Sequence, residues 1–247
     1  MALGSLYTSM AGLETTTERL DTVSQNLANT NTQGYAAQQT AAMALPYSGP
    51  DAPKGTDVIS LGESVDTRSG PMTRTGSPFD VAVKGGWLLV RTHNGAKALT
   101  RNGHLAQSAN GLLTTMTGEP VLDSAGNPVS LPLLRSMTIG ANGEISGIPA
   151  GSASQQPQVY GRLYLAATPA GGSLHPLGNT LYGLPKGVSP SRATNASVQQ
   201  GYLEGSNVSS VKSMIDMIDV SREYQLQTQI MGDNAKTQTE LNQIMMA

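Results

Sequence analysis

Apolar residues near the N-terminus recur at the spacing of an amphipathic helix. From Leu3 they fall three or four positions apart, and four leucines lie seven residues apart, as in a coiled-coil seam. The opposite face is polar, and the pattern stops at a polar run from Asn29 to Gly34. We predict one helix of about 25 residues, whose packing stripe consists of Leu3, Leu6, Met10, Leu13, Leu20 and Leu27.

The C-terminal segment carries two apolar stripes. Ser206 or Asn207 is a suitable N-cap for a helix that begins there. Two stripes on one helix indicate that more than one side is covered, so we expect contacts within the chain and with other chains. The first stripe is Val208, Val211, Ile215 and Ile218, and the second is Met217, Val220, Tyr224, Met231, Leu241 and Met245.

Between the two ends the hydrophobic period changes from that of a helix to that of a strand. Short apolar runs, such as Trp87–Arg91 and Gln158–Ala167, alternate with turn signals. Asn-Gly pairs close tight hairpins, because both residues adopt positive φ at little cost. They occur at Asn94-Gly95, Asn102-Gly103, Asn110-Gly111 and Asn142-Gly143.

These patterns predict an α+β fold. Long N- and C-terminal helices are expected to pair as a coiled coil that forms a helical core, with an inserted all-β domain of short hairpins. The connector before that domain is rich in Pro and Gly and is expected to have little regular structure. The predicted parts are an N-terminal assembly helix (1–34), the connector (35–64), the β domain (65–190), a return segment (191–205) and a C-terminal assembly helix (206–247).

Composition excludes several classes of function. A net charge of -2 with 13% charged residues provides no basic field for nucleic acid. The chain has no cysteine, which excludes disulfides and thiolate sites and is compatible with passage through an oxidising compartment. No apolar run approaches the about 20 residues that span a bilayer, and no cleaved signal peptide is indicated at the N-terminus.

The sequence offers no recognisable catalytic constellation. His93, His104 and His175 lie far apart, and no G-x-S-x-G elbow or complete phosphate-binding loop occurs. Carboxylates are scattered without a spacing that demands a site, and Met residues at helical spacing are typical of adaptable packing. We therefore predict that the protein is not an enzyme and uses no cofactor, no metal and no small-molecule substrate.

Two terminal motifs resemble those of the bacterial flagellar axial proteins, the rod and hook family. The first is LDTVSQNLANTNTQGYAAQ at Leu20–Gln38, and the second is QGYLEGSNVSSVKSMIDMIDVSREYQLQTQI at Gln200–Ile230. In the middle, TGSPFDVAVKGGWLLV at Thr75–Val90 and LTRNGHLAQSANGLLTTMTGEPVL at Leu99–Leu122 are similar to the β-domain segments of rod proteins. The resemblance therefore covers most of the chain apart from the connector and residues 147–199.

Within this family the resemblance favours the proximal rod over the distal rod. Hook proteins are much longer, and the small rod proteins lack a β domain. The phrase SGPMTRTGSPFDVAV looks closer to the proximal member, and Ser221 stands where the distal member usually has Gln. An adhesin-like or phage-tail-like β protein would share the turns but would not need these helical ends.

The resemblance implies a structural subunit of the drive shaft that carries torque from motor to hook. It implies export through the flagellar type III apparatus without a cleaved signal, and assembly in the basal-body rod across the periplasm. The expected partners are copies of the chain, the small proximal rod proteins, the distal rod protein and the export apparatus, but no nucleic acid. The expected assembly interface comprises Leu3, Leu6, Met10, Leu13, Leu20, Leu27, Asn29, Val208, Val211, Ile215, Ile218, Tyr224, Met231 and Leu241.

Overall fold

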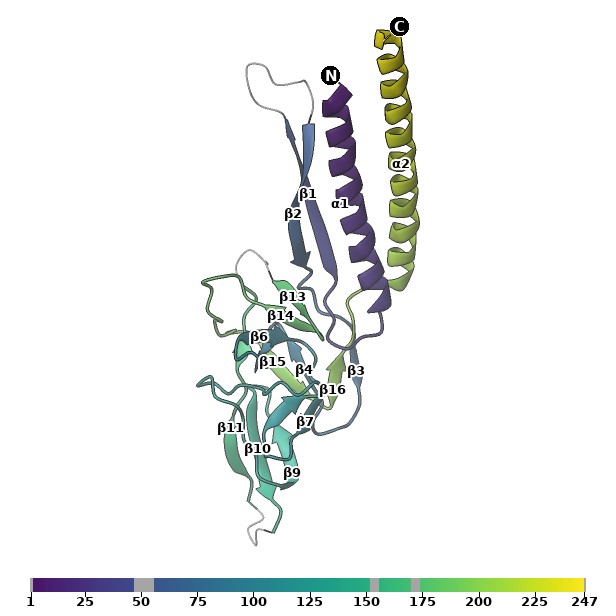
Figure 1. Ribbon diagram of the computed structural model, residues 1–247. Coiled ribbons are helices and arrows are strands. Elements are labelled where there is room, and N and C mark those ends of the chain that lie inside the picture. Colours follow the sequence, from purple (N-terminus) through teal and green to yellow (C-terminus); the bar gives the residue numbers. More distant parts are fainter. Residues whose placement is uncertain (1, 47–55, 152–155, 170–173, 247) are drawn as a thin grey trace. The chain divides into compact units, whose positions relative to one another are not determined.

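The computed structural model describes residues 2–46, 56–151, 156–169 and 174–246 (Figure 1). The chain divides into two compact units. The helical unit comprises Met1–Ala28, Gln38–Ser64 and Ser209–Ala247, and the β unit comprises Asn29–Ala37 and Val65–Val208. The chain therefore passes between the units four times. None of the described helices combines the length and the apolar character needed to cross a membrane.

The helical unit contains two helices and one long hairpin. Helix α1 spans Ala2–Ala28 and helix α2 spans Ser210–Met246. Strands β1 (Gln38–Pro46) and β2 (Thr56–Val65) form a two-stranded sheet. Figure 1 shows α1 between this hairpin and α2, so α1 has neighbours on two sides.

The β unit is built from short antiparallel strands. A five-stranded sheet has the order β12-β5-β6-β14-β13, a three-stranded sheet has the order β11-β10-β9, and three strand pairs complete the unit, namely β15-β4, β16-β3 and β7-β8. The strands are β3 (Met72–Arg74), β4 (Val81–Lys84), β5 (Trp87–Arg91), β6 (Lys97–Thr100), β7 (Leu105–Gln107), β8 (Leu113–Thr115), β9 (Leu134–Ile139), β10 (Glu144–Pro149), β11 (Gln158–Arg162), β12 (Leu165–Ala166), β13 (His175–Gly178), β14 (Leu181–Gly183), β15 (Ser197–Gln200) and β16 (Tyr202–Glu204).

Two apolar clusters form the core of the β unit. The larger one is centred on β4, β5 and β10, where Val81, Leu88 and Ile145 are fully buried. The smaller one surrounds Trp87, whose ring meets Tyr182 edge-on with 5.3 Å between the ring centroids. Strand β5 contributes alternate residues to both clusters, because successive side chains of a strand point to opposite faces.

Three of the four predicted Asn-Gly turns close hairpins, but only their glycines have positive φ, since Asn179 and Thr180 are the non-glycine residues with positive φ in the described part of the chain. Gly95, Gly111 and Gly143 all have φ close to +80°, the region that glycine enters without steric cost. Asn102-Gly103 is different, since a Cβ on Gly103 would lie 1.6 Å from the carbonyl oxygen of Val81. Glycine is required here because the neighbouring backbone packs too closely to leave room for a Cβ.

The predicted fold class is wrong. The described chain consists mainly of β hairpins with one helix at each end, and pairing of these helices as a coiled coil is not shown. Among the described side chains of α1, the most deeply buried are threonines, while three residues of the expected seam of α2 are more than half exposed, namely Val211, Ile215 and Ile218. A leucine repeat indicates an apolar stripe, but it does not decide which face of each helix meets the other.

Two further local expectations are corrected. The segment predicted to have little regular structure contains β1 and β2. The predicted N-cap of the second helix was Ser206 or Asn207, but α2 begins at Ser210 and the hydroxyl of Ser209 accepts a hydrogen bond from the N–H of Lys212. Asn207 is occupied by other hydrogen bonds, described below. The predicted domain boundaries stay a prediction.

Candidate assembly interface

The packed face of α1 is made of threonines as well as leucines. Thr15, Thr16 and Thr22 are less than 9% exposed. The hydroxyls of Thr16 and Thr22 donate to carbonyl oxygens four residues earlier, at Gly12 (2.8 Å) and Glu18 (2.9 Å). Because the helix itself satisfies these hydroxyls, they are buried without an orphaned polar group. A prediction based on apolar residues alone does not identify these buried threonines.

The predicted interface residues of α1 have mixed environments. Three leucines are half-buried, namely Leu13, Leu20 and Leu27, and so is Asn29 just after the helix. Met10 is 51% exposed. The side chains of Leu3 and Leu6 lie outside the described residues. The described leucines therefore keep part of their apolar surface accessible.

Polar contacts link the two helices of the helical unit. The Thr16 hydroxyl lies 3.0 Å from the Gln227 side-chain oxygen, and Arg19 forms an ion pair with Glu223 at 2.8 Å. Both partners of this ion pair are nearly half exposed, so it contributes at most about 1 kcal/mol. These contacts position the helices more than they stabilise them.

Helix α2 has two different apolar faces. Val220 is buried, and Met217, Tyr224 and Met231 are half-buried on the same side. Val211, Ile215 and Ile218 are 67%, 54% and 53% exposed on the opposite side, with Met214 and Leu226 beside them. The structure thus separates the predicted residues of α2 into a covered set and an uncovered set. Val208 lies in the β unit, and the side chain of Leu241 is outside the described residues.

Asn26 joins α1 to strand β1. Its side-chain amide donates to the carbonyl oxygen of Gln38 and accepts from the N–H of the same residue, both at 2.8 Å. The amide thereby forms the pair of hydrogen bonds that a neighbouring strand would make. Beside it, the hydroxyls of Thr22 and Thr40 lie 2.7 Å apart. The sequence motif contained Asn26, but its spacing gave no sign of this contact.

Within the β unit, three chain segments meet at what we call the polar junction, residues 34–37, 66–70 and 204–207. Asn207 is its central residue. Its side-chain oxygen accepts from the N–H of Ala37 at 2.7 Å, and its side-chain nitrogen donates to the carbonyl oxygens of Asp66 (3.0 Å) and Arg68 (2.8 Å). One side chain therefore binds two other segments of the junction.

A buried ion pair connects Arg101 to the polar junction. Arg101 Nη1 is 3.2 Å from Glu204 Oε1, and the two side chains are 5% and 2% exposed. Arg101 also donates to the carbonyl oxygens of Thr67 and Arg68, and its guanidinium lies 4.2 Å from the centre of the Trp87 ring. The arginine thus binds the 66–70 segment to the core.

Burial governs the electrostatics of this ion pair. It raises the pKa of the Glu204 carboxyl and lowers the pKa of Arg101, while attraction between the two opposes both shifts. Arg101 Nε and Glu204 Oε2 have no hydrogen-bond partner among the described residues. A buried pair with unsatisfied atoms favours a defined geometry more than high stability.

Close backbone packing completes the polar junction. A Cβ on Gly70 would lie 2.2 Å from the carbonyl oxygen of Gly205, and a Cβ on Gly34 would lie 2.2 Å from the N of Asn102. The Tyr182 hydroxyl accepts from the N–H of Ala36 at 2.7 Å, and burial raises the pKa of this tyrosine to about 12. The tyrosine is therefore neutral at physiological pH.

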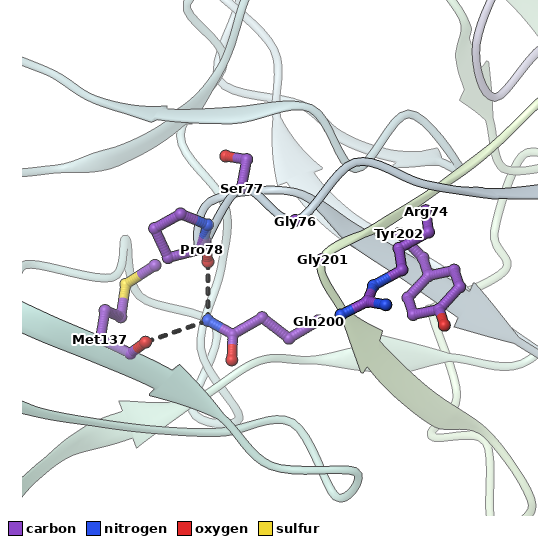
Figure 2. Close-up of a pocket in the computed structure, with 8 residues that line it drawn as sticks. All are labelled: Arg74, Gly76, Ser77, Pro78, Met137, Gln200, Gly201 and Tyr202. Atoms are coloured by element: carbon purple, nitrogen blue, oxygen red, sulfur yellow. Dashed lines mark hydrogen bonds between the residues drawn. The ribbon is translucent and has the colours of Figure 1, made fainter.

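The β unit also carries a pocket of about 320 Å³ between β3, β16 and β9 (Figure 2). The Gln200 amide crosses it, donating to the carbonyl oxygens of Pro78 (2.7 Å) and Met137 (3.1 Å). Figure 2 shows the Arg74 and Tyr202 side chains at the end away from Met137. Arg74 and Tyr202 are paired residues of strands β3 and β16.

The histidines do not form a common site. His104 Nδ1 lies 2.6 Å from a carboxylate oxygen of Asp80, and His93 Nδ1 lies 3.8 Å from a carboxylate oxygen of Glu119. In the described part of the chain, no three His, Cys, Asp or Glu side chains gather as a metal site.

Comparison with known protein families gives three matches along the chain. Residues 6–35 match the model described as "Flagella basal body rod protein", and residues 82–147 match "Flagellar hook protein FlgE/F/G D1 domain". Residues 199–244 match "Flagellar basal body rod FlgEFG protein C-terminal". The first and last matches include most of α1 and α2, and the middle one lies within the β unit.

Individual relatives match over nearly their whole length. The chain is 34% identical to the flagellar basal-body rod protein FlgF of Escherichia coli K12, covering 96% of this chain and 97% of the relative. It is 30% identical to FlgF of Salmonella typhimurium, covering 98% of each. It is 28% identical to the rod protein FlgG of Buchnera aphidicola from Schizaphis graminum, covering 97% of this chain and 99% of that protein.

Proposed function

Because the chain belongs to the FlgF family of flagellar basal-body rod proteins, and is a structural rod subunit, we propose that it polymerises through its terminal helices into the proximal part of the rod. There it is part of the drive shaft that transmits torque from motor to hook. Its role is mechanical and not catalytic.

The uncovered apolar face of α2 carries this proposal. Val211, Met214, Ile215, Ile218 and Leu226 are each more than half exposed, on the side away from the covered residues Val220 and Tyr224. Burying such a side chain contributes about 1.5 to 3 kcal/mol. A group of exposed apolar side chains on one side of a helix is typical of a surface that another chain covers.

Neighbouring axial subunits are the proposed occupants of this face. They are further copies of the chain, the small proximal rod proteins and the distal rod protein. Leu13, Leu20, Leu27 and Met10 of α1 contribute their remaining accessible surface to the same assembly. We propose that α1 also forms part of the signal read by the flagellar type III export apparatus, and that the rod crosses the periplasm. The inserted β domain, 65–190, then remains a separate module of each subunit.

An aspartate at Ile218 tests the role of the uncovered face. Since Ile218 is 53% exposed, Ile218→Asp leaves the subunit folded and changes only the surface offered to other chains. We expect a non-motile strain whose isolated basal bodies lack a complete rod. Assembly is measured by electron microscopy of basal bodies, and folding by circular dichroism of the purified variant.

The matched control is Thr228→Asp, which places the same charge at an exposed position of α2 outside this face, where the Thr228 hydroxyl bonds only to carbonyl oxygens of its own helix. This strain is expected to be motile. Normal basal bodies and swimming in the Ile218→Asp strain, at normal protein levels, would contradict assembly through this face.

A further inference from the structure

We infer that the acidic exposed face of α1 in one copy of the chain binds the Arg74 pocket of the β unit in a neighbouring copy. The inference rests on the proposed function, because it requires copies of the chain to assemble side by side. It identifies a second, polar contact in addition to the apolar face of α2.

The two units carry opposite net charge. The β unit has ten Lys and Arg residues against six Asp and Glu, which gives +4, and the helical unit has five against eleven, which gives -6. The chain's total of -2 conceals this separation. Charge separated in this way favours attraction between unlike units of neighbouring copies.

The positive charge of the β unit is available because its carboxylates are already engaged. Five of them pair with Arg68, His104, threonine hydroxyls, Arg162 or Arg101, and Asp123 accepts from backbone N–H groups of its own turn. In the described part of the β unit, five exposed cations have no hydrogen bond or ion pair, namely Arg74, Lys84, Lys97, Arg135 and Lys186.

The free face of α1 supplies the complementary charge. Met10, Glu14, Thr17, Asp21 and Ala28 are all exposed and recur at helical spacing. The carboxylates of Glu14 and Asp21 have no ion pair among the described residues, and no cation shares this face. Seven residues separate the two carboxylates, so they lie about 10 Å apart along the helix.

The Arg74 pocket has the chemistry to bind a carboxylate. Neither the Arg74 guanidinium nor the Tyr202 hydroxyl bonds to another described residue, and the two residues are neighbours across β3 and β16. Ser77 lines the same pocket. Hydrogen bonds to both the oxygen and the nitrogen of the Gln200 side-chain amide hold that side chain across the pocket. An arginine accepts a carboxylate through two parallel hydrogen bonds, and tyrosine and serine hydroxyls provide further donors.

Cysteine cross-linking tests this contact cleanly, because the chain has no cysteine of its own. Two tagged forms are expressed together, one with Thr17→Cys and one with Ser77→Cys, so that Glu14, Asp21 and Arg74 remain intact. A disulfide between the two tags in isolated basal bodies can only join different copies. We expect this product, and we expect none when Lys186→Cys replaces Ser77→Cys.

Charge reversal then identifies the groups responsible. Arg74→Glu should reduce the cross-linked product tenfold or more, because like charges in contact cost more than about 1.4 kcal/mol. Combining it with Glu14→Arg and Asp21→Arg in the other form should restore the product. Basal bodies that contain both tags but give no cross-link, or a yield that Arg74→Glu leaves unchanged, would overturn the inference alone. Absence of the chain from basal bodies would instead overturn the proposed function.

Discussion

Single side chains hold together the three chain segments of the polar junction. Each of these segments lies next to a point where the chain passes between the two units. Asn207 and Arg101 each bind two or more backbone groups on other segments, and both act through hydrogen bonds that few other side chains can replace. The sequence predicted Ser206 or Asn207 as the N-cap of the C-terminal helix. The structure shows instead that these residues come before the helix, because Ser209 caps it.

The Glu204 carboxyl makes stability depend on pH in an unusual direction. Burial raises its folded pKa above the ordinary 4.5, so the native state binds more protons than the unfolded state between these two values. Its contribution to stability is therefore complete below pH 4.5 and decreases as the pH rises through the folded pKa. Glu204→Gln, which cannot ionise, should be at least as stable as the native chain at pH 7.

Urea unfolding between pH 4.5 and 8 measures this effect, and the advantage of Glu204→Gln should shrink towards pH 4.5. Glu204→Ala is the contrasting variant. It leaves Arg101 and the Gly70 N–H without their acceptor and should lose about 3 kcal/mol. The opposite result would be a Glu204→Gln variant that is less stable than the native chain at pH 7, with a difference in free energy of unfolding that disappears in acid. It would show that folding lowers the pKa of Glu204 instead of raising it.

At the scale of elements, sequence reasoning succeeded where one local pattern determines the result. Helix α1 and strand β5 were predicted nearly to the residue, because periodicity and turn residues mark their ends. The same reasoning failed for β1 and β2, which lie in a segment whose Pro and Gly content suggested irregular structure. Contacts with α1 through Asn26 and Thr22 support β1, and sequence spacing does not reveal them.

The coiled-coil prediction failed for a related reason. An apolar period identifies the stripes of a helix, but threonine hydroxyls that bond within α1 allow a partly polar face to be buried. Helix α2 has an uncovered apolar face, which supports the proposed assembly. The predicted interface residues of α1 and α2 remain a proposal that the Ile218→Asp experiment tests.

The hairpin of the helical unit should depend on Asn26. Asn26→Ala removes both bonds to the Gln38 backbone, with an expected loss of about 1 to 3 kcal/mol and faster exchange of the Gln38 amide hydrogen. Hydrogen exchange measured residue by residue checks this. Thr17→Ala is the control, since the Thr17 hydroxyl bonds only to Leu13 of its own helix. Equal protection of Gln38 in both variants would show that Asn26 does not hold β1.

At the scale of the whole molecule, function was recognised through motifs and not through geometry. Composition gave no basic field that would favour nucleic-acid binding, and spacing predicted helices that pack against partners, but it was the motifs that indicated a flagellar rod. The separation of charge between the units cannot be predicted from the sequence alone, because it depends on which segments fold together. Assembly at both the apolar and the acidic faces would give each subunit several neighbours, as a stiff shaft requires.

A density map of isolated basal bodies, at a resolution that distinguishes side chains, tests the central claim most directly. It should place this chain in the rod between the small proximal rod proteins and the distal rod protein. In that map, neighbouring chains should cover Val211, Ile215 and Ile218 of α2. A map in which the chain occupies the distal rod, or in which this face of α2 remains exposed to solvent, would contradict the account.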